Sequence, residues 1–178
     1  MFALFKNPKS NTKTTQTFFF KGFSLIEVIL VLGIIATLFA VGYANFRGYQ
    51  RRQAIMSTAR QVEGEIRLAQ EYASQGKKPS TTCTGYLNGY LFVVNSDPAN
   101  TYDIIADCSG NDEVIKDNMA ITTGMTLTPA TTMLFKVLGL GTDIPSDSPK
   151  TLVVTQTETQ EKVDIIITYS GVISVDFE

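Results

Sequence analysis

The amino-acid sequence predicts an α+β protein in which a long N-terminal α-helix packs on a C-terminal antiparallel β-sheet domain. Two observations predict the helix: residues 23–78 contain no proline, and apolar residues in the second part of this stretch recur at helical spacing. A third predicts the sheet, because after Pro79 the composition turns to Thr, Val, Ile and turn-forming residues. The 178 residues leave room for one ordinary domain.

The composition disfavours most enzyme classes. The chain has no His, which removes the usual general base near neutral pH and the commonest metal ligand. Its two Cys cannot alone build a four-thiolate zinc site or hold an iron–sulfur cluster. We therefore expect a protein that is not an enzyme.

The first half of the predicted helix has the properties of a membrane segment. Residues 1–22 carry four Lys and no acid, and they are predicted to be a disordered leader peptide. Residues 23–46 are predicted to be the transmembrane half of the helix, because residues 28–46 are uncharged and a helix of that length spans about 30 Å. The alternative is a buried core helix, for which a small domain offers little cover.

Residues 47–76 are predicted to be the amphipathic half of the same helix. Apolar residues recur there in alternating steps of four and three, while the charged residues fall elsewhere. Glycine, lysine and proline at residues 76–79 predict its end. The apolar positions are Ile55, Ala59, Val62, Ile66, Ala69 and Ala73.

Residues 77–178 are predicted to form a β-rich globular head domain. Two strands, 89–95 and 101–108, are expected to form a hairpin, and Ser170-Gly171 predicts a second hairpin at the end of the chain. Some strands are apolar at both odd and even positions, so the sequence does not decide which of their faces is buried. The other expected strands are 124–128, 132–138, 151–157, 162–169 and 172–177.

Glu27 stands at the edge of the apolar run, where a carboxylate inside lipid costs about 2.5 to 3.5 kcal/mol on insertion scales. A cut between Gly22 and Phe23 would create an ammonium group. In a stack of parallel, axially offset helices, that ammonium could neutralise Glu27 of a neighbouring chain. The alternative is a glutamate that reaches the lipid headgroups by itself.

The segment KGFSLIEVILVLGIIATLFAVGYANF, residues 21–46, resembles the N-terminal signature of type IV pilins and type II secretion pseudopilins. The shared features are a basic leader, a glycine, a phenylalanine, a glutamate at the fifth mature position and about 20 apolar residues. The resemblance implies that a prepilin peptidase cuts after Gly22 and N-methylates Phe23. It also implies that Glu27 is the assembly carboxylate, and that the fold is a pilin fold.

Further segments resemble minor pseudopilins of the GspH/FimT type. They are residues 65–71, near the end of the predicted helix, and residues 134–142, 152–155 and 166–173. This chain departs from the family pattern in two ways. Major pilins often carry a proline in the apolar helix, whereas this chain has only Gly33 and Gly42 there. DNA-binding minor pilins of this type display a basic C-terminal face, whereas residues 175–178 contain two acids.

The resemblance implies a set of partners and a location. The partners are other pilin or pseudopilin subunits, the prepilin peptidase, an inner-membrane assembly platform and membrane lipid. The chain would cross the cytoplasmic (inner) membrane once, with its head domain outside, and then enter an extracellular or periplasmic filament. Arg47, Arg51 and Arg52 alone would favour the opposite orientation, so the peptidase site decides it.

Nucleic acid is not an expected partner. Residues 76–178 carry six Lys and no Arg against 13 Asp or Glu, which disfavours binding to a phosphate backbone. The favoured function is a structural filament subunit, a minor pilin or a pseudopilin. The alternatives are an adhesive or DNA-uptake minor pilin and, least favoured, a membrane-anchored enzyme.

Cys83 and Cys108 are an even pair on the expected oxidising side of the membrane. Cys108 ends one predicted hairpin strand and Cys83 precedes the other, so the two are predicted to form a disulfide. The alternative is two buried free thiols.

An acidic loop follows the second predicted strand. It contains Asp107, Asn111, Asp112 and Glu113, whose oxygen atoms are suitable ligands for calcium. The loop lacks the residue order of an EF-hand, so a solvated turn is the favoured interpretation and calcium the weaker one. No other cofactor is expected.

Overall fold

The computed structural model describes residues 22–79 and 82–177. The predicted leader, residues 1–21, lies outside the described residues, and Gly22 is the first residue within them. The chain divides into two compact units, Met1–Ala44 and Asn45–Glu178, which are described separately below as the first and second unit.

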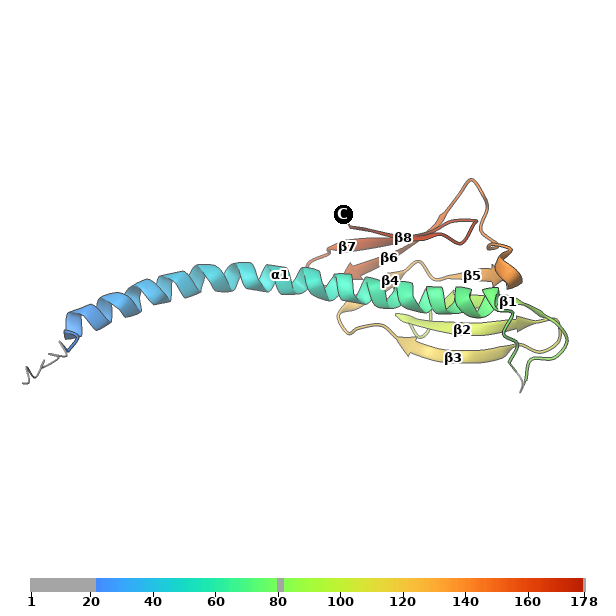
Figure 1. Ribbon diagram of the computed structural model, residues 1–178, viewed down its shortest axis with the longest axis horizontal. Coiled ribbons are helices and arrows are strands. Elements are labelled where there is room, and N and C mark those ends of the chain that lie inside the picture. The colour runs from blue at the N-terminus through green and yellow to red at the C-terminus, as the bar shows by residue number, and fades with distance from the viewer. Residues whose placement is uncertain (1–21, 80–81, 178) are drawn as a thin grey trace, which may run out of the picture. The chain divides into compact units, whose positions relative to one another are not determined.

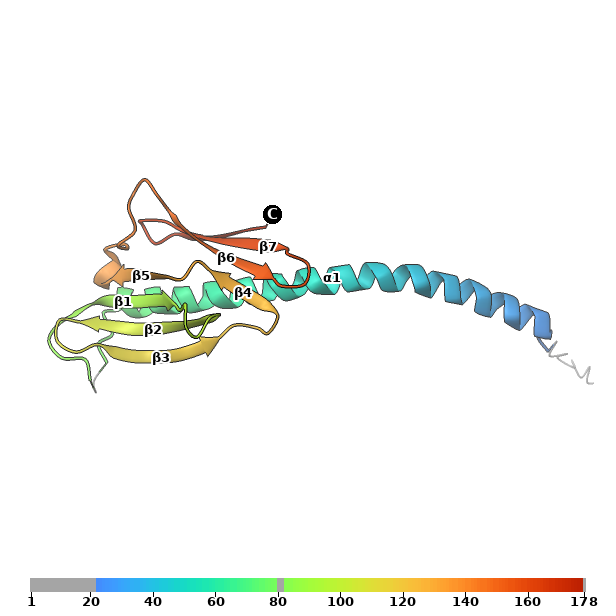
Figure 2. The ribbon, with the colours of Figure 1, turned by 180° about the vertical axis from the view of Figure 1, so that it is seen from behind.

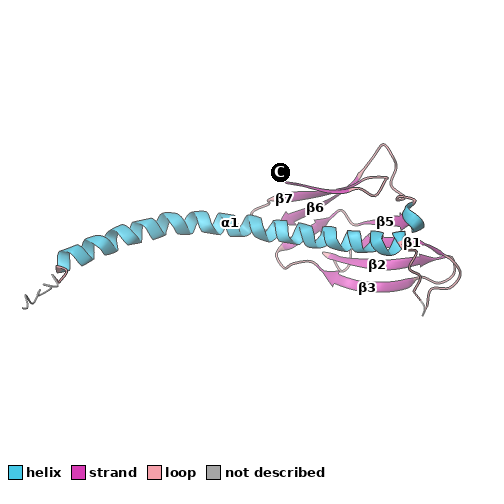
Figure 3. Ribbon diagram, viewed as in Figure 1, coloured by secondary structure: helices cyan, strands magenta, loops and turns pink. Residues whose placement is uncertain are grey.

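Helix α1, Leu25–Ser74, confirms the single long helix that the absence of proline predicts (Figure 3). It begins after Ser24, whose carbonyl and hydroxyl oxygens accept hydrogen bonds from the Glu27 amide at 3.0 and 3.3 Å. It ends at Ser74, and Gly76 just beyond it has a φ of +59°. The amides of Gly76 and Lys77 donate to the carbonyls of Ala73 and Tyr72, which forms a Schellman motif.

In the first unit, the described large apolar side chains of α1 are exposed. Phe23, which precedes the helix, and Leu25 are each 79% exposed, and exposed apolar side chains continue along the helix. The other exposed side chains are Ile26, Val28, Ile29, Leu30, Val31, Leu32, Ile34, Ile35, Leu38, Phe39 and Tyr43. Across the described residues, the structure contains no helix with both the length and the apolar character required to span a bilayer.

In the second unit, the predicted amphipathic face of α1 is confirmed. Ile55, Ala59, Val62, Ile66, Ala69 and Ala73 are all buried. They belong to one apolar core that includes residues from both sheets. Figures 1 and 2 show the strands running alongside this part of the helix, on one side of it.

Eight strands form two antiparallel sheets of four. The first sheet has the order β3-β2-β1-β5, and the second has the order β4-β6-β7-β8. Both predicted hairpins are present, as β1–β2 and β7–β8. The bounds are Leu87–Val94 (β1), Thr101–Cys108 (β2), Glu113–Ala120 (β3), Met125–Thr128 (β4), Thr131–Lys136 (β5), Lys150–Gln156 (β6), Lys162–Ile167 (β7) and Ile173–Phe177 (β8).

The sequence analysis was wrong to place no strand between residues 108 and 124, because strand β3 lies there. Its N-terminal residue Glu113 had been assigned to the acidic loop. The pattern gave little warning, because β3 is an edge strand with mostly exposed residues and an irregular register against β2. Irregularity and charge at a sheet edge are common protections against pairing with another chain.

The strand predicted at residues 132–138 is also corrected at its end. Strand β5 stops at Lys136, and a short 3-10 helix, η1 (Val137–Gly139), follows. Leu138 adopts a φ of +56°, which no strand accommodates. The faces that the sequence left open are now assigned: Ile165 and Ile167 are buried, and Ile166 between them is half-buried.

Candidate functional site

The residues predicted for processing and assembly lie together at the start of α1. Gly22 and Phe23 precede the helix, and Glu27 lies in its first turn. A carboxylate there is favourably placed near the positive end of the helix dipole, and the Glu27 side chain is exposed. The geometry leaves the peptide bond between Gly22 and Phe23 and the Glu27 carboxylate accessible to another molecule.

Glu65 of α1 is linked to β3 by an ion pair. Lys116 of β3 places Nζ 2.6 Å from Glu65 Oε2, and both side chains are mostly covered. The buried Tyr102 lies near this carboxylate: burial, with a smaller contribution from the Glu65 charge, raises the pKa of Tyr102 to about 12. The pair therefore fixes the edge of the first sheet against the helix.

Tyr90 connects the end of the helix to strand β1. Its ring packs on Tyr72 with centroids 5.5 Å apart, and its hydroxyl donates to the carbonyl of Lys77. Burial, followed by Tyr72 and Glu113, raises the pKa of Tyr90. The neutral phenol is therefore the form that the fold favours.

The predicted disulfide between Cys83 and Cys108 is confirmed, with a Cα–Cα distance of 5.7 Å. It joins the segment that follows α1 to the end of β2. Backbone hydrogen bonds reinforce this connection, because the Thr84 amide donates to the Asn111 carbonyl and the Gly110 amide donates to the Thr84 carbonyl. Cys83 and Thr84 are therefore held covalently to the end of β2 and by hydrogen bonds to the turn that follows it.

The acidic residues of the calcium hypothesis accept hydrogen bonds, each from a different part of the chain. Asp112 Oδ1 accepts from the Cys108 amide at 2.8 Å, and Glu113 Oε2 accepts from the amides of Thr82 and Cys83 at 2.9 and 3.2 Å. Asp107 accepts from the Asn88 amide group. The described part of the chain holds no group of three or more His, Cys, Asp or Glu that could bind a metal.

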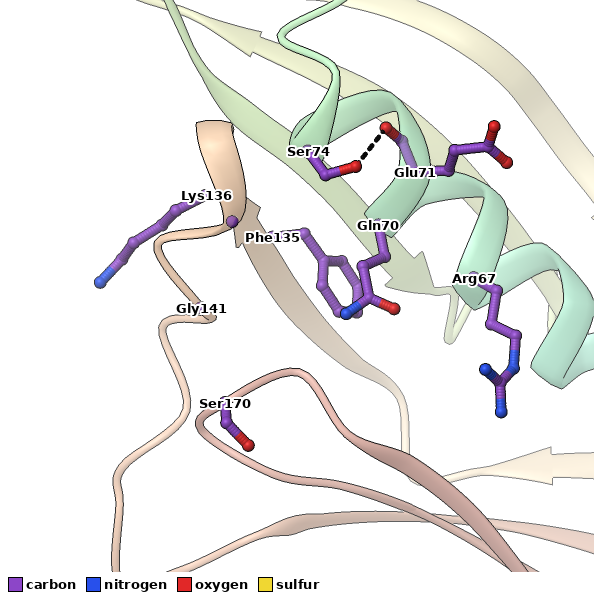
Figure 4. Close-up of a pocket in the computed structure, with 9 residues that line it drawn as sticks. Arg67, Gln70, Glu71, Ser74, Phe135, Lys136, Gly141 and Ser170 are labelled. Carbon is purple, nitrogen blue, oxygen red and sulfur yellow. Dashed lines mark hydrogen bonds between the residues drawn. The ribbon is translucent and has the colours of Figure 1, made fainter.

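A hollow of about 340 Å³ lies in the second unit, between the last turns of α1 and two other turns (Figure 4). Gln70 Nε2 donates to the Gly171 carbonyl at 2.8 Å, which connects the helix to the turn between β7 and β8. The Thr142 amide donates to the Tyr169 carbonyl at 3.0 Å, which holds the two turns side by side. The residues that line the hollow include Arg67, Gln70, Phe135, Lys136, Gly141 and Ser170.

Four exposed apolar residues lie next in sequence to, or within two residues of, the lining residues Gly139, Gly141 and Ser170, but they do not line the hollow themselves. Leu138 and Leu140 are 74% and 66% exposed, and Tyr169 and Val172 are 49% and 61% exposed. Sequence reasoning missed the hollow: it predicted a turn at Ser170-Gly171, but nothing in the sequence showed that this turn lies beside residues 139–141 and the end of α1. For the exposed residues, leucines flanking Gly139 in a turn were the available signal.

A helix packed on antiparallel sheets, with an apolar and exposed first half, is consistent with the pilin fold. The sequence is similar to the type IV major fimbrial protein FimA of Dichelobacter nodosus, with 30% identity over 98 residues. That alignment covers 54% of this chain and 61% of FimA, so the chain spans less than two thirds of this relative. The similarity supports a pilin-like structural subunit.

No family model matches the chain. No solved structure matches it either.

Proposed function

We propose that the chain is a type IV pilin-like structural subunit, a minor pilin or a pseudopilin, that assembles into a pilus or a type II secretion pseudopilus. The observation that carries this proposal is the contrast between the two parts of α1. The second part buries a continuous apolar face in its own domain, whereas the first part exposes large apolar side chains. Exposed apolar surface of this extent favours burial against lipid or other chains.

The proposed sequence of events begins in the inner membrane, with the second unit outside. A prepilin peptidase cuts after Gly22 and methylates the new amino group of Phe23, and an assembly platform then moves the subunit into the filament. Helix–helix packing replaces lipid as the cover of the first half of α1. The exposed positions of Gly22 and Phe23 before the helix support access by the peptidase.

Glu27 is the proposed assembly residue. The free ammonium of one subunit would neutralise the Glu27 carboxylate of its neighbour, because an unpaired charge is costly once water and headgroups are excluded. The pair would thereby set the axial offset between helices. A substitution that keeps the shape of Glu27 but removes its charge should affect incorporation without affecting cleavage.

The experiment that tests the proposal is mass spectrometry of the amino terminus, together with immunoblotting of sheared surface fractions. The expected chain begins with N-methylated Phe23 and is present in the filament fraction. A chain that keeps residues 1–22 in the filament fraction would contradict the processing step. Absence of the chain from every filament or pseudopilus fraction would contradict the proposed function itself.

A further inference from the structure

The segment before β1 and the turn after β2 are held together by hydrogen bonds as well as by the disulfide. The Thr84 amide donates to the Asn111 carbonyl at 3.3 Å, and the Asn111 amide donates to the Thr84 hydroxyl at 2.9 Å. The Ser109 amide donates to the Tyr86 carbonyl at 2.9 Å, and the Tyr86 amide donates to the Ser109 hydroxyl at 3.0 Å. These bonds align the two cysteine-bearing segments without any contribution from the sulfur atoms.

Each cysteine of the bridge also donates its own backbone amide to a carboxylate. The Cys108 amide donates to Asp112 Oδ1 at 2.8 Å. Glu113 Oε2 accepts from the Cys83 amide at 3.2 Å and from the Thr82 amide at 2.9 Å. Hydrogen bonds to an ionised acceptor are about twice as strong as those between neutral groups. Asp112 and Glu113, which we call the carboxylate clamp, therefore fix the backbone on both sides of the bridge.

Two glycines permit the two segments to approach this closely. A Cβ at Gly110 would lie 2.2 Å from the Thr84 hydroxyl oxygen, and a Cβ at Gly85 would lie 2.1 Å from the Ser109 hydroxyl oxygen. A side chain at either position would push the segments apart. The local fold therefore sets the separation of the two segments, and the bridge joins cysteines that the fold has already brought together.

We propose that the carboxylate clamp positions Cys83 and Cys108 for oxidation and holds their segments in place in the reduced chain. Asp112 and Glu113 are positioning residues that exchange no electrons. With glutathione disulfide as the oxidant, one cysteine thiolate attacks the oxidant and releases one glutathione. The other thiolate attacks the mixed disulfide and releases the second. The cysteines lose two electrons and two protons, and the oxidant gains them as two glutathione molecules.

The clamp acts by raising the effective concentration of one thiol at the other. The two cysteines are separated by 25 residues, and closing that loop costs entropy unless other contacts have already closed it. The coupling is reciprocal, so the bridge strengthens the clamp by the same factor as the clamp favours the bridge. This inference concerns the second unit alone and does not depend on the proposed filament function.

Equilibration of the full-length chain in detergent with mixtures of reduced and oxidised glutathione tests the proposal. Glu113→Ala and Asp112→Ala are each expected to lower the equilibrium constant for oxidation by about tenfold, a shift of about 30 mV. Glu113→Gln keeps an oxygen acceptor and should lie between the wild type and Glu113→Ala. Asp107→Ala is the matched control and should keep the wild-type constant, because Asp107 precedes Cys108 in sequence but accepts from the Asn88 side chain.

Three results would overturn the proposal. They are an unchanged constant in Glu113→Ala, an equal shift in Asp107→Ala, and a Glu113→Gln variant no better than Glu113→Ala.

Hydrogen exchange of the reduced wild-type chain keeps the test valid if a variant fails to fold. The amides of Cys83 and Cys108 are expected to exchange more slowly than those of an unstructured peptide, since the clamp still accepts their hydrogen bonds. The Ile165 amide, in the interior strand β7, reports that the fold is intact. Exchange of both cysteine amides at unstructured rates, with Ile165 still protected, would show that the bridge alone holds the segments and would overturn the proposal.

Discussion

Lys116 of strand β3 and Glu65 of helix α1 form an ion pair with 2.6 Å between Nζ and Oε2, across 51 residues of sequence. The side chains are 29% and 20% exposed, so solvent screens the pair only in part. The pair attaches the irregular edge strand β3 to the helix. Few apolar side chains of β3 are buried there to hold the strand in place.

Removing Lys116 should therefore loosen this edge. We expect Lys116→Met to lower the free energy of unfolding by about 1 kcal/mol, since the pair is partly screened. Urea unfolding of the detergent-solubilised chain measures the effect. In a double-mutant cycle, Glu65→Gln should cost little more once Lys116 is absent. Fully additive costs would show that the two side chains do not interact energetically.

Replacing both Cys83 and Cys108 by Ser should lower the free energy of unfolding by about 3 kcal/mol, because the bridge closes a loop of about 25 residues in the unfolded chain. Thermal or urea unfolding checks this value. A reducing agent should produce a similar loss in the wild type and no loss in the double variant. Equal stability with and without reductant would contradict the prediction.

Tyr102 should make the fold sensitive to alkali. Its pKa rises from about 10 in the unfolded chain to about 12 in the folded one, so the folded state holds this proton more tightly. The stabilising contribution is complete below pH 10 and is lost as pH rises from 10 to 12. We expect Tyr102→Phe to show a weaker loss between pH 9 and 11 in urea titrations. The exposed Tyr86→Phe variant is the control and should retain the wild-type slope.

Gly141 and Gly139 form a matched pair for a test of the turn beside the hollow. Both have positive φ, but a Cβ at Gly141 would lie 2.8 Å from the Tyr169 carbonyl oxygen, whereas a Cβ at Gly139 meets no atom within 4 Å. We expect Gly139→Ala to cost about 1 kcal/mol for its backbone conformation and Gly141→Ala to cost distinctly more. Equal melting temperatures for the two variants would refute the close approach.

Glu27→Gln should leave the amount of cleaved, methylated chain unchanged and lower its incorporation into filaments by about tenfold, as the loss of about 1.4 kcal/mol at each contact predicts. Quantitative immunoblots of membrane and sheared fractions measure both quantities. Ser24→Ala, which removes a helix cap but no charge, is the control. Equal incorporation of Glu27→Gln and wild type would argue against the charge pair.

The helix was predictable because two independent signals agreed. Absence of proline set its length, and the spacing of Ile55, Val62 and Ile66 set its buried face. Both hairpins were predictable from strand composition and from turn residues such as Ser170-Gly171. Cys83 and Cys108 were predictable as a pair because the first hairpin brings their segments together.

The rest depended on long-range contacts. Strand β3 exposes most of its residues, so no alternating pattern marks it, and its attachment through Lys116 depends on a helix residue far away in the sequence. The acidic residues Asp112 and Glu113 suggested a metal, but their oxygens accept hydrogen bonds from backbone amides near the disulfide. Composition alone cannot distinguish a carboxylate that binds a cation from one that binds an amide.

The buried stripe of α1 also has a mechanical consequence. Within the second unit, the residues from Ile55 to Ala73 lie along the strands, over roughly 27 Å at 1.5 Å per residue (Figure 1). Tension that enters this unit through the helix would load that whole stripe in shear, so its contacts would resist together instead of separating one after another. Such a subunit could bear a sustained pull along its axis while its outer loops stay unstressed.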